Sequence, residues 1–343
     1  MNRAKMIEKL FPSGIPRLWC PILTHYTHDK AIDFDRMSMH INYLKPYCNS
    51  YLIPGSTGDA WELSEDEIDS LIEFALKNAK KEGFTLLIGA LEKDAQSTLS
   101  TINKRINTIK KVSGCNDAFD AMEQTGVKGF VVCPPSDVKD QGEIYSQLES
   151  ILECELPICL YQLPQVTNSE MTPNTVSDLA KSYDNVFMVK DSSGEDKIAM
   201  ADADYSGITL VRGAEGSYAS HMKEFGGTYD GLLLSTVNSF PQALGEFIQA
   251  TNENRETDAK TLSDNISLAI QEGFELVGNI TAGNAFANAN KCFDYWNAFG
   301  RDGNIKGLPM LHGGVRIGIV KLDAACEILR KTNMLANEGY VIK

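Results

Sequence analysis

Short apolar segments recur along the first two thirds of the chain, and most of them are followed by Gly, Pro, Thr or Ser. The segments are continuously apolar rather than alternating, as expected for parallel strands that are covered on both faces. They begin 22 to 44 residues apart, which is the length of a strand, a loop and a helix. The eight segments are 19–23, 51–53, 86–88, 130–133, 158–161, 187–189, 210–211 and 232–234.

The intervals between these segments have the period of amphipathic helices, and two of them begin with clear start signals. Ser64 and Glu67 have capping-box spacing ahead of an apolar stripe that runs to Lys80. Thr172 precedes Pro173, which places a capping side chain before a proline at the first helical position. Eight strands alternating with helices predict a (β/α)8 TIM barrel, an α/β fold.

Two parts of the chain have more helical pattern than an alternation of single strands with single helices requires. The interval between the third and fourth segments holds a long helical stretch, a turn and a second helical piece at 118–124, so we expect an insertion near 112–121. After the eighth segment the pattern is helical only. We therefore expect a barrel over residues 1–240 and a C-terminal helical extension over 241–343.

Composition narrows the classes of function. The 343 residues include 32 Lys and Arg against 46 Asp and Glu, a net charge of −14. That balance argues against partners such as nucleic acid or an anionic membrane, which require clustered cations. No segment has the apolar length of a membrane span, and residues 1–12 lack a signal-peptide core, so a cytoplasmic protein is predicted. The eight cysteines show no metal-ligand spacing and lie mostly in apolar runs; neither a metal nor a disulfide is predicted.

Three groups at expected strand ends could perform chemistry, since the active residues of such barrels lie at the carboxyl ends of the strands. Lys190 follows the sixth segment, where desolvation would favour a nucleophilic amine. Tyr161 ends the fifth segment and could relay protons. Ser56 and Thr57 stand in a Gly-Ser-Thr-Gly loop that could bind a carboxylate. The alternatives are a lysine paired with Asp191, a packing tyrosine and a simple glycine-rich turn.

An amine, a phenol and a carboxylate site at one barrel mouth suit Schiff-base formation with a 2-oxo acid. The iminium would serve as an electron sink for carbon–carbon cleavage or loss of water. This chemistry needs no metal or cofactor.

The sequence resembles the dihydrodipicolinate synthase and N-acetylneuraminate lyase superfamily of class I, pyruvate-type aldolases. Four stretches carry the resemblance in the family's order, namely GSTGDAWELSEDE, YQLPQVT, VKDSSGED and YDGLLLSTVNSFP. It implies a Schiff-base role for Lys190, a proton relay through Tyr161 and carboxylate binding by Ser56 and Thr57, with Thr57 also in the hydroxyl relay. It places Gly213 in the substrate pocket and implies a homotetramer or homodimer without a dissociable cofactor.

Departures from the family pattern bear on the substrate. Members that make dihydrodipicolinate have an Arg where this chain has Val166, and a relay Tyr after the strand-four proline where this chain has Pro135 and Ser136. Ser192, Glu215 and Ser235 resemble polar residues of the sugar-acid members, and such groups suit polyol recognition. The alternative for Glu215 is a solvated acid at a helix start.

The sequence therefore favours a lyase, an aldolase or a dehydratase, that acts on a 2-oxo-3-deoxy sugar acid such as N-acetylneuraminate or 2-keto-3-deoxygluconate, with pyruvate as the aldolase product. One alternative is dihydrodipicolinate synthase, which condenses pyruvate with aspartate semialdehyde. Another is a catalytically silent paralogue that binds a 2-oxo acid.

Overall fold

The chain folds into a closed barrel of eight parallel strands, described in a computed structural model over residues 1–304 and 307–341. Each strand pairs with its neighbours in sequence order, and β8 pairs with β1 to close the barrel. The predicted fold class is thus confirmed. The strands are β1 (Leu18–Pro21), β2 (Ser50–Ile53), β3 (Thr85–Gly89), β4 (Val127–Val132), β5 (Ile158–Gln162), β6 (Val186–Asp191), β7 (Thr209–Arg212) and β8 (Gly231–Leu233).

Helices surround the strands, and the two start signals found in the sequence are present. Ser64 and Glu67 form a reciprocal capping box at the start of α3, and the Thr172 side chain caps α8. The helices of this part are α1 (Arg3–Leu10), α2 (Phe34–Leu44), α3 (Glu65–Glu82), α4 (Ala95–Ser113), α5 (Ala118–Thr125), α6 (Gln141–Leu152), α7 (Pro164–Thr167), α8 (Pro173–Ser182), α9 (Lys197–Met200) and α10 (Tyr218–His221), with 3-10 turns η1 (Ser56–Gly58), η2 (Lys223–Phe225) and η3 (Ser235–Asn238).

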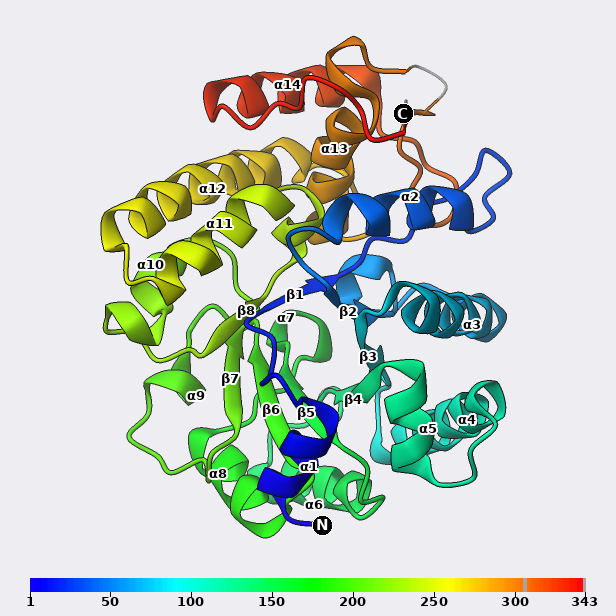
Figure 1. The fold of residues 1–343 in the computed structure, drawn as a ribbon, viewed down its shortest axis with the longest axis vertical. Coiled ribbons are helices and arrows are strands. Elements are labelled where there is room, and N and C mark those ends of the chain that lie inside the picture. The colour runs from blue at the N-terminus through cyan, green and yellow to red at the C-terminus, as the bar shows by residue number, and fades with distance from the viewer. Residues whose placement is uncertain (305–306, 342–343) are drawn as a thin grey trace.

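The interval between β3 and β4 contains two helices, α4 and α5, as the sequence pattern suggested. Gly114 ends α4 in a left-handed conformation, and the Asp117 side chain caps α5. The two helices pack against each other on the outside of the barrel (Figure 1). We propose, as the sequence suggests, that residues near 112–121 are an insertion.

After β8 the chain is helical and packs at one end of the molecule, opposite α1 (Figure 1). We propose residue 240 as the boundary between the barrel and this extension; residues 305–306 and 342–343 of the predicted extension lie outside the described residues. Its elements are α11 (Pro241–Asn252), α12 (Glu256–Val277), α13 (Ala285–Phe299), η4 (Gly300–Asp302) and α14 (Ile319–Lys331).

The apolar core has two layers. The larger lies between the strands and the surrounding helices and continues into the extension. The smaller fills the barrel interior with inward side chains such as Trp19, Leu87 and Phe187, and is joined by Met6 and Leu10 of α1. Helix α1 is held there by Arg3, whose guanidinium donates to the backbone oxygens of Val186 and Tyr183. This packing fills one end of the barrel interior, so any active site in the barrel must lie at the opposite end.

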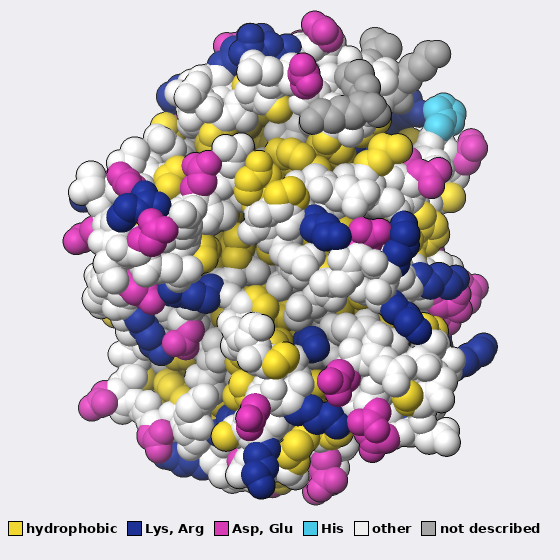
Figure 2. All heavy atoms as spheres, viewed as in Figure 1, with side chains coloured by type: hydrophobic (Ala, Val, Ile, Leu, Met, Phe, Trp, Pro, Cys, Tyr) yellow, Lys and Arg dark blue, Asp and Glu magenta, His cyan; other side chains and the backbone are white. Residues whose placement is uncertain are grey.

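The surface carries charged side chains of both signs (Figure 2), as the composition of the chain implies. Cationic and anionic side chains are interspersed over the face seen in Figure 2, so this face carries no continuous basic patch. Among the described residues, no helix combines the length and apolar character that crossing a membrane requires.

Candidate active site

Lys190 and Tyr161 lie side by side at the carboxyl ends of β6 and β5. The two residues are register partners in the parallel ladder. The Lys190 Nζ atom lies 3.9 Å from the centroid of the Tyr161 ring, close enough for a cation–π contact. Val189 packs in the outer layer, so the alternation of the strand turns Lys190 toward the interior. Both side chains are buried, with exposures of 3% for Lys190 and 2% for Tyr161.

The alternative of a simple ion pair for Lys190 is not observed. No carboxylate of the described residues lies within ion-pair distance of its ammonium. Asp191, the partner considered from the sequence, instead accepts a hydrogen bond from the Ser193 backbone N–H through Oδ1. Burial raises the pKa of Asp191, and its Oδ2 atom has no partner among the described residues. A buried amine without a neighbouring counter-ion has the environment that a nucleophilic lysine requires.

Gly213 is placed against Lys190 by the loop that follows β7. Its backbone N–H donates to Asp191 O at 2.6 Å. A Cβ atom at this position would lie 2.0 Å from Ser192 Oγ and 2.8 Å from Lys190 Cε. The close approach therefore requires glycine, and it brings Gly213 and Ser192 next to Lys190. Contact of either residue with substrate stays a prediction.

The Ser56–Thr57 turn follows β2 at the same end of the barrel. It is the 3-10 turn η1, and both side chains are buried. Ser56 Oγ accepts a hydrogen bond from the Trp61 indole N–H at 2.9 Å, which leaves the hydroxyl proton free to donate to a ligand. Thr57 Oγ1 forms no hydrogen bond within the described residues. The first N–H groups of a helical turn also lack internal acceptors, so this turn can present several donors to a carboxylate.

Glu215 joins the loops after β7 and β8 rather than being solvated. One of its oxygens accepts from Ser235 Oγ at 2.5 Å and from the Thr236 N–H at 3.1 Å; the other accepts from Thr236 Oγ1 at 2.6 Å and Tyr218 OH at 2.8 Å. A carboxylate offers about four acceptor positions, and all are used here. Direct contact of Glu215 with substrate stays a prediction, and it would require one of these bonds to break.

Sequence reasoning missed the contribution of α13, which is buried over most of its length. Lys291 forms an ion pair with Asp59 at 3.0 Å, and Asn284 donates to the Ser56 backbone oxygen at 3.0 Å. Asn290 donates to Ser235 Oγ at 3.0 Å. The available signal was a set of five polar residues in an otherwise apolar helix, but only the fold shows what they contact. These residues are Asn288, Asn290, Lys291, Asp294 and Asn297.

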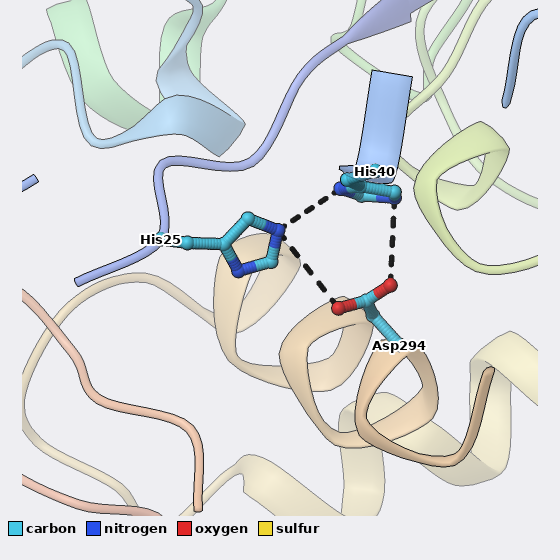
Figure 3. Close-up of side chains that lie close together, drawn as sticks. All are labelled: His25, His40 and Asp294. Atoms are coloured by element: carbon cyan, nitrogen blue, oxygen red, sulfur yellow. Dashed lines mark hydrogen bonds and ion pairs between the residues drawn. The ribbon is translucent and has the colours of Figure 1, made fainter. Parts of the chain in front are cut away.

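A buried cluster of His25, His40 and Asp294 joins the β1 loop, α2 and α13 (Figure 3). His40 Nε2 lies 3.0 Å from the Asn238 backbone oxygen and must donate to it, so His40 Nδ1 accepts from His25 Nε2 at 3.0 Å. Burial and the Arg36 guanidinium lower the pKa of His25, and Arg36 pairs with Asp294 at 2.7 Å. Hydrogen bonds and this ion pair account for the cluster, so we assign no metal to it.

A third buried ion pair supports the loop after β6. The Arg212 guanidinium contacts both oxygens of Asp196, at 3.0 and 3.2 Å, and Tyr229 OH donates to the same carboxylate at 2.6 Å. Burial alone would raise the pKa of Asp196, but hydrogen bonds from His221, Arg212 and Tyr229 hold that pKa well below its usual range. The charged pair thus fixes the segment that follows Lys190.

Comparison with known proteins agrees with this arrangement. The model of the Dihydrodipicolinate synthetase family matches residues 82–281, more than half of the chain. The chain belongs to this family. The matched residues include Lys190, Tyr161 and Gly213, whereas the Ser56–Thr57 turn and all of α13 lie outside them.

Similar proteins extend the comparison. The 4-hydroxy-tetrahydrodipicolinate synthase of Rickettsia bellii (strain OSU 85-389) is 32% identical over 172 residues, 48% of this chain and 50% of the relative. The chain thus spans about half the length of the first curated relatives it matches. A crystal structure of YagE, a prophage protein of the dihydrodipicolinic acid synthase family from E. coli K12 in complex with pyruvate, has a TM-score of 0.70 at 20% identity and covers 92% of this chain and 98% of that one. At this identity the likeness shows the fold.

We predict that the Asp196 charge stabilises this family member in a pH-dependent way. Its pKa is lowered on folding, so the stability it contributes is present above the usual aspartate pKa and is lost as pH falls below that value. Asp196→Asn should lower the free energy of unfolding at pH 7 by about 3–5 kcal/mol, because Arg212 is left buried without its counter-ion. Below about pH 4 the difference from wild type should shrink by about 1.4 kcal/mol per pH unit.

Urea unfolding between pH 7 and pH 3 measures this difference. The exposed Asp202→Asn is the matched control and should change stability by no more than about 0.5 kcal/mol at any pH. A difference for Asp196→Asn that stays constant down to pH 3 would contradict the role given to its charge.

Proposed function

We propose that this protein is an enzyme, a Schiff-base-forming lyase of the class I aldolase type that acts on a 2-oxo acid. The observation that supports this most strongly is the buried Lys190 ammonium at the carboxyl end of β6, which has no carboxylate partner among the described residues and lies against the Tyr161 ring. The pyruvate in the YagE structure is a 2-oxo acid of the class that such a site would bind.

In this proposal the neutral Lys190 amine attacks the C2 carbonyl carbon of the substrate. The carbonyl oxygen then leaves as water, and a protonated imine joins Lys190 to C2. As the C3–C4 bond breaks, its electron pair moves toward the iminium and gives an enamine. Tyr161 relays the proton of the C4 hydroxyl, because it passes its own phenolic proton to C3 as it takes up the hydroxyl proton. C4 becomes the carbonyl carbon of an aldehyde. Protonation at C3 and hydrolysis of the imine release pyruvate and restore the amine. Dehydration would share the early imine steps.

Ser56 and Thr57 would bind the substrate carboxylate. Their hydroxyls form no hydrogen bond with a carboxylate of the described residues, and Ser56 retains a proton to donate after accepting from Trp61. Hydroxyl donors suit a small anion in a chain of net charge −14, since they need no neighbouring cation. We also propose that Thr57 belongs to the proton relay. The homotetramer or homodimer implied by the family resemblance stays a prediction.

For the substrate we propose a 2-oxo-3-deoxy sugar acid. Val166 occupies the position where dicarboxylate-binding members are expected to have an arginine, and it is 47% exposed on α7. An apolar, exposed side chain provides no clamp for a second carboxylate. Ser192 Oγ forms no hydrogen bond within the described residues, and Ser235 Oγ keeps an acceptor position after donating to Glu215 and accepting from Asn290. Both hydroxyls are suited to a polyol chain.

A second candidate is 4-hydroxy-tetrahydrodipicolinate synthase, favoured by the names of the curated relatives. It would use the same Lys190 imine to condense pyruvate with aspartate semialdehyde. A catalytically silent 2-oxo-acid-binding protein is the third candidate, and the close pairing of Lys190 with Tyr161 favours catalysis over it.

Borohydride reduction in the presence of pyruvate tests the proposed chemistry. We expect one pyruvate-derived adduct per chain, located on Lys190 by peptide mapping, because borohydride converts the imine to a stable secondary amine. Lys190→Met should form none, whereas the buried Lys291→Met should still react at Lys190 when pyruvate is saturating. No adduct, or an adduct on another lysine, would refute the Schiff-base assignment.

Tyr161→Phe tests the proton relay. The substitution keeps the aromatic contact with Lys190 and removes only the hydroxyl, so imine formation should persist. Turnover should fall by about 10²-fold or more, the usual size of a general acid–base contribution. Steady-state kinetics on an accepted substrate measures the effect, and near-normal turnover would remove Tyr161 from this role.

A substrate panel separates the first two candidates. Wild-type protein is assayed for pyruvate release from N-acetylneuraminate and 2-keto-3-deoxygluconate, for dehydration of the latter, and for condensation of pyruvate with aspartate semialdehyde. We expect kcat/KM for one sugar acid to exceed that for aspartate semialdehyde at least tenfold. Val166→Arg supplies the missing guanidinium and should therefore lower the ratio of kcat/KM for the sugar acid to kcat/KM for aspartate semialdehyde. Preference of the wild type for aspartate semialdehyde would favour the synthase.

A further inference from the structure

We infer that Lys291 and Asn284, on helix α13 of the extension, are positioning residues for the Ser56–Thr57 turn, an inference that rests on the proposed function. Lys291 Nζ lies 3.0 Å from Asp59 Oδ2, and both side chains are 2% exposed. Asn284 Nδ2 donates to the Ser56 backbone oxygen at 3.0 Å. Through these two contacts the extension holds the turn at both of its ends.

Asp59 is the residue through which Lys291 acts on the turn. It follows Gly58 directly and has a left-handed backbone, with φ of 62°. Its N–H donates to Ser56 O, and its own backbone oxygen accepts from Leu63 N on the way into α3. A change in the position of Asp59 is therefore transmitted to Ser56 through the backbone.

The position of the buried Asp59 carboxylate depends on Lys291 because the two side chains form an ion pair. A carboxylate buried to this extent is stable only when it is paired and hydrogen-bonded. Tyr26 OH donates to Asp59 Oδ2 at 2.9 Å, but Lys291 is the one cation of the described residues within ion-pair distance. The Lys291 ammonium also lies 4.8 Å from the Tyr26 ring centroid. Without this cation, Asp59 would turn toward solvent or take up a proton, and either change would disturb the turn.

On the side of the β1 loop, the turn is held by a hydrogen bond that Thr24 Oγ1 donates to Gly58 O at 2.7 Å. A Cβ atom at Gly58 would lie 2.5 Å from the Ile22 backbone oxygen, so the turn already rests against the β1 loop with no space behind it. On its other side, α13 provides both polar contacts. Among the described residues, Lys190 on β6 forms no hydrogen bond or ion pair with α13. Loss of the α13 contacts should therefore change 2-oxo acid affinity rather than the reactivity of the amine.

A purely structural role for Lys291 and Asn284 would give a different experimental result. In that case Lys291 and Asn284 would stabilise the extension against the barrel, and their loss would lower the melting temperature without a selective change in pyruvate affinity. The two roles are separated by the dependence of adduct formation on pyruvate concentration, which gives a half-saturating concentration and a maximal rate.

The experiment uses two isosteric substitutions and one charge deletion in the full chain. Asn284→Asp keeps the oxygen that caps α13 but replaces the donor to Ser56 with a second oxygen. Asn288→Asp makes the same chemical change four residues along the helix, where the donor faces Ala282 O inside the extension. Lys291→Met removes the charge at similar length. Melting temperature, borohydride trapping against pyruvate concentration, and hydrogen exchange of peptides that contain residues 55–61 are measured for each.

We expect Lys291→Met to raise the half-saturating pyruvate concentration about tenfold or more, since a displacement of about 1 Å can cost 10²-fold. Asn284→Asp should raise it by about 3–10-fold, with faster exchange at 55–61 in both variants and maximal trapping rates within about threefold of wild type. Asn288→Asp should leave the half-saturating concentration and this exchange unchanged, whatever its melting temperature.

Half-saturating concentrations within twofold of wild type for both Lys291→Met and Asn284→Asp would overturn the inference, as would an equal rise in Asn288→Asp. If Lys291→Met does not fold, the inference is tested by comparing the half-saturating pyruvate concentrations of Asn284→Asp and Asn288→Asp. Failure of wild-type protein to form any adduct on Lys190 is a different result, since it refutes the proposed function and this inference with it.

Discussion

Closure of eight parallel strands into one barrel is the constraint on which the rest of the structure depends. Because every strand runs in the same direction, all eight carboxyl ends meet at one end of the molecule, and the loops that follow them share that end. Lys190, Tyr161, the Ser56–Thr57 turn and Gly213 come from four different strands or the loops that follow them, and this closure places them at the same end of the barrel. The interior below them is filled by apolar side chains and packed at the far end by α1.

The second determinant is the distribution of buried charge. Asp59, Asp196 and Asp294 are each buried against a cation, respectively Lys291, Arg212 and Arg36. The members of these pairs lie in loops, in α2, in β7 and in α13. Lys190 differs from them, since no carboxylate of the described residues neutralises it. Burial of paired charge thus gives rigid loops, whereas burial of an unpaired amine gives a group suited to nucleophilic chemistry.

The sequence predicted the strands and the ends of several helices because those depend on local patterns, such as continuous apolar runs and the Ser64 capping box. It also predicted that Lys190 and Tyr161 lie on neighbouring strands, since strand order follows chain order in this barrel. It could not show that Glu215 is fully hydrogen-bonded or that α13 contacts the Ser56–Thr57 turn. Those contacts join residues as much as 232 positions apart, and their partners are set by how the extension packs, which no local pattern encodes.

In the proposed mechanism, Lys190 forms an imine with a 2-oxo acid whose carboxylate is bound by the Ser56–Thr57 turn. A crystal structure of the protein soaked with pyruvate tests both parts at once. We expect continuous electron density from Lys190 Nζ to C2 of pyruvate, with the carboxylate oxygens within hydrogen-bond distance of the Ser56 and Thr57 hydroxyls. Pyruvate bound elsewhere, or bound at Lys190 with its carboxylate held by other residues, would contradict this mechanism.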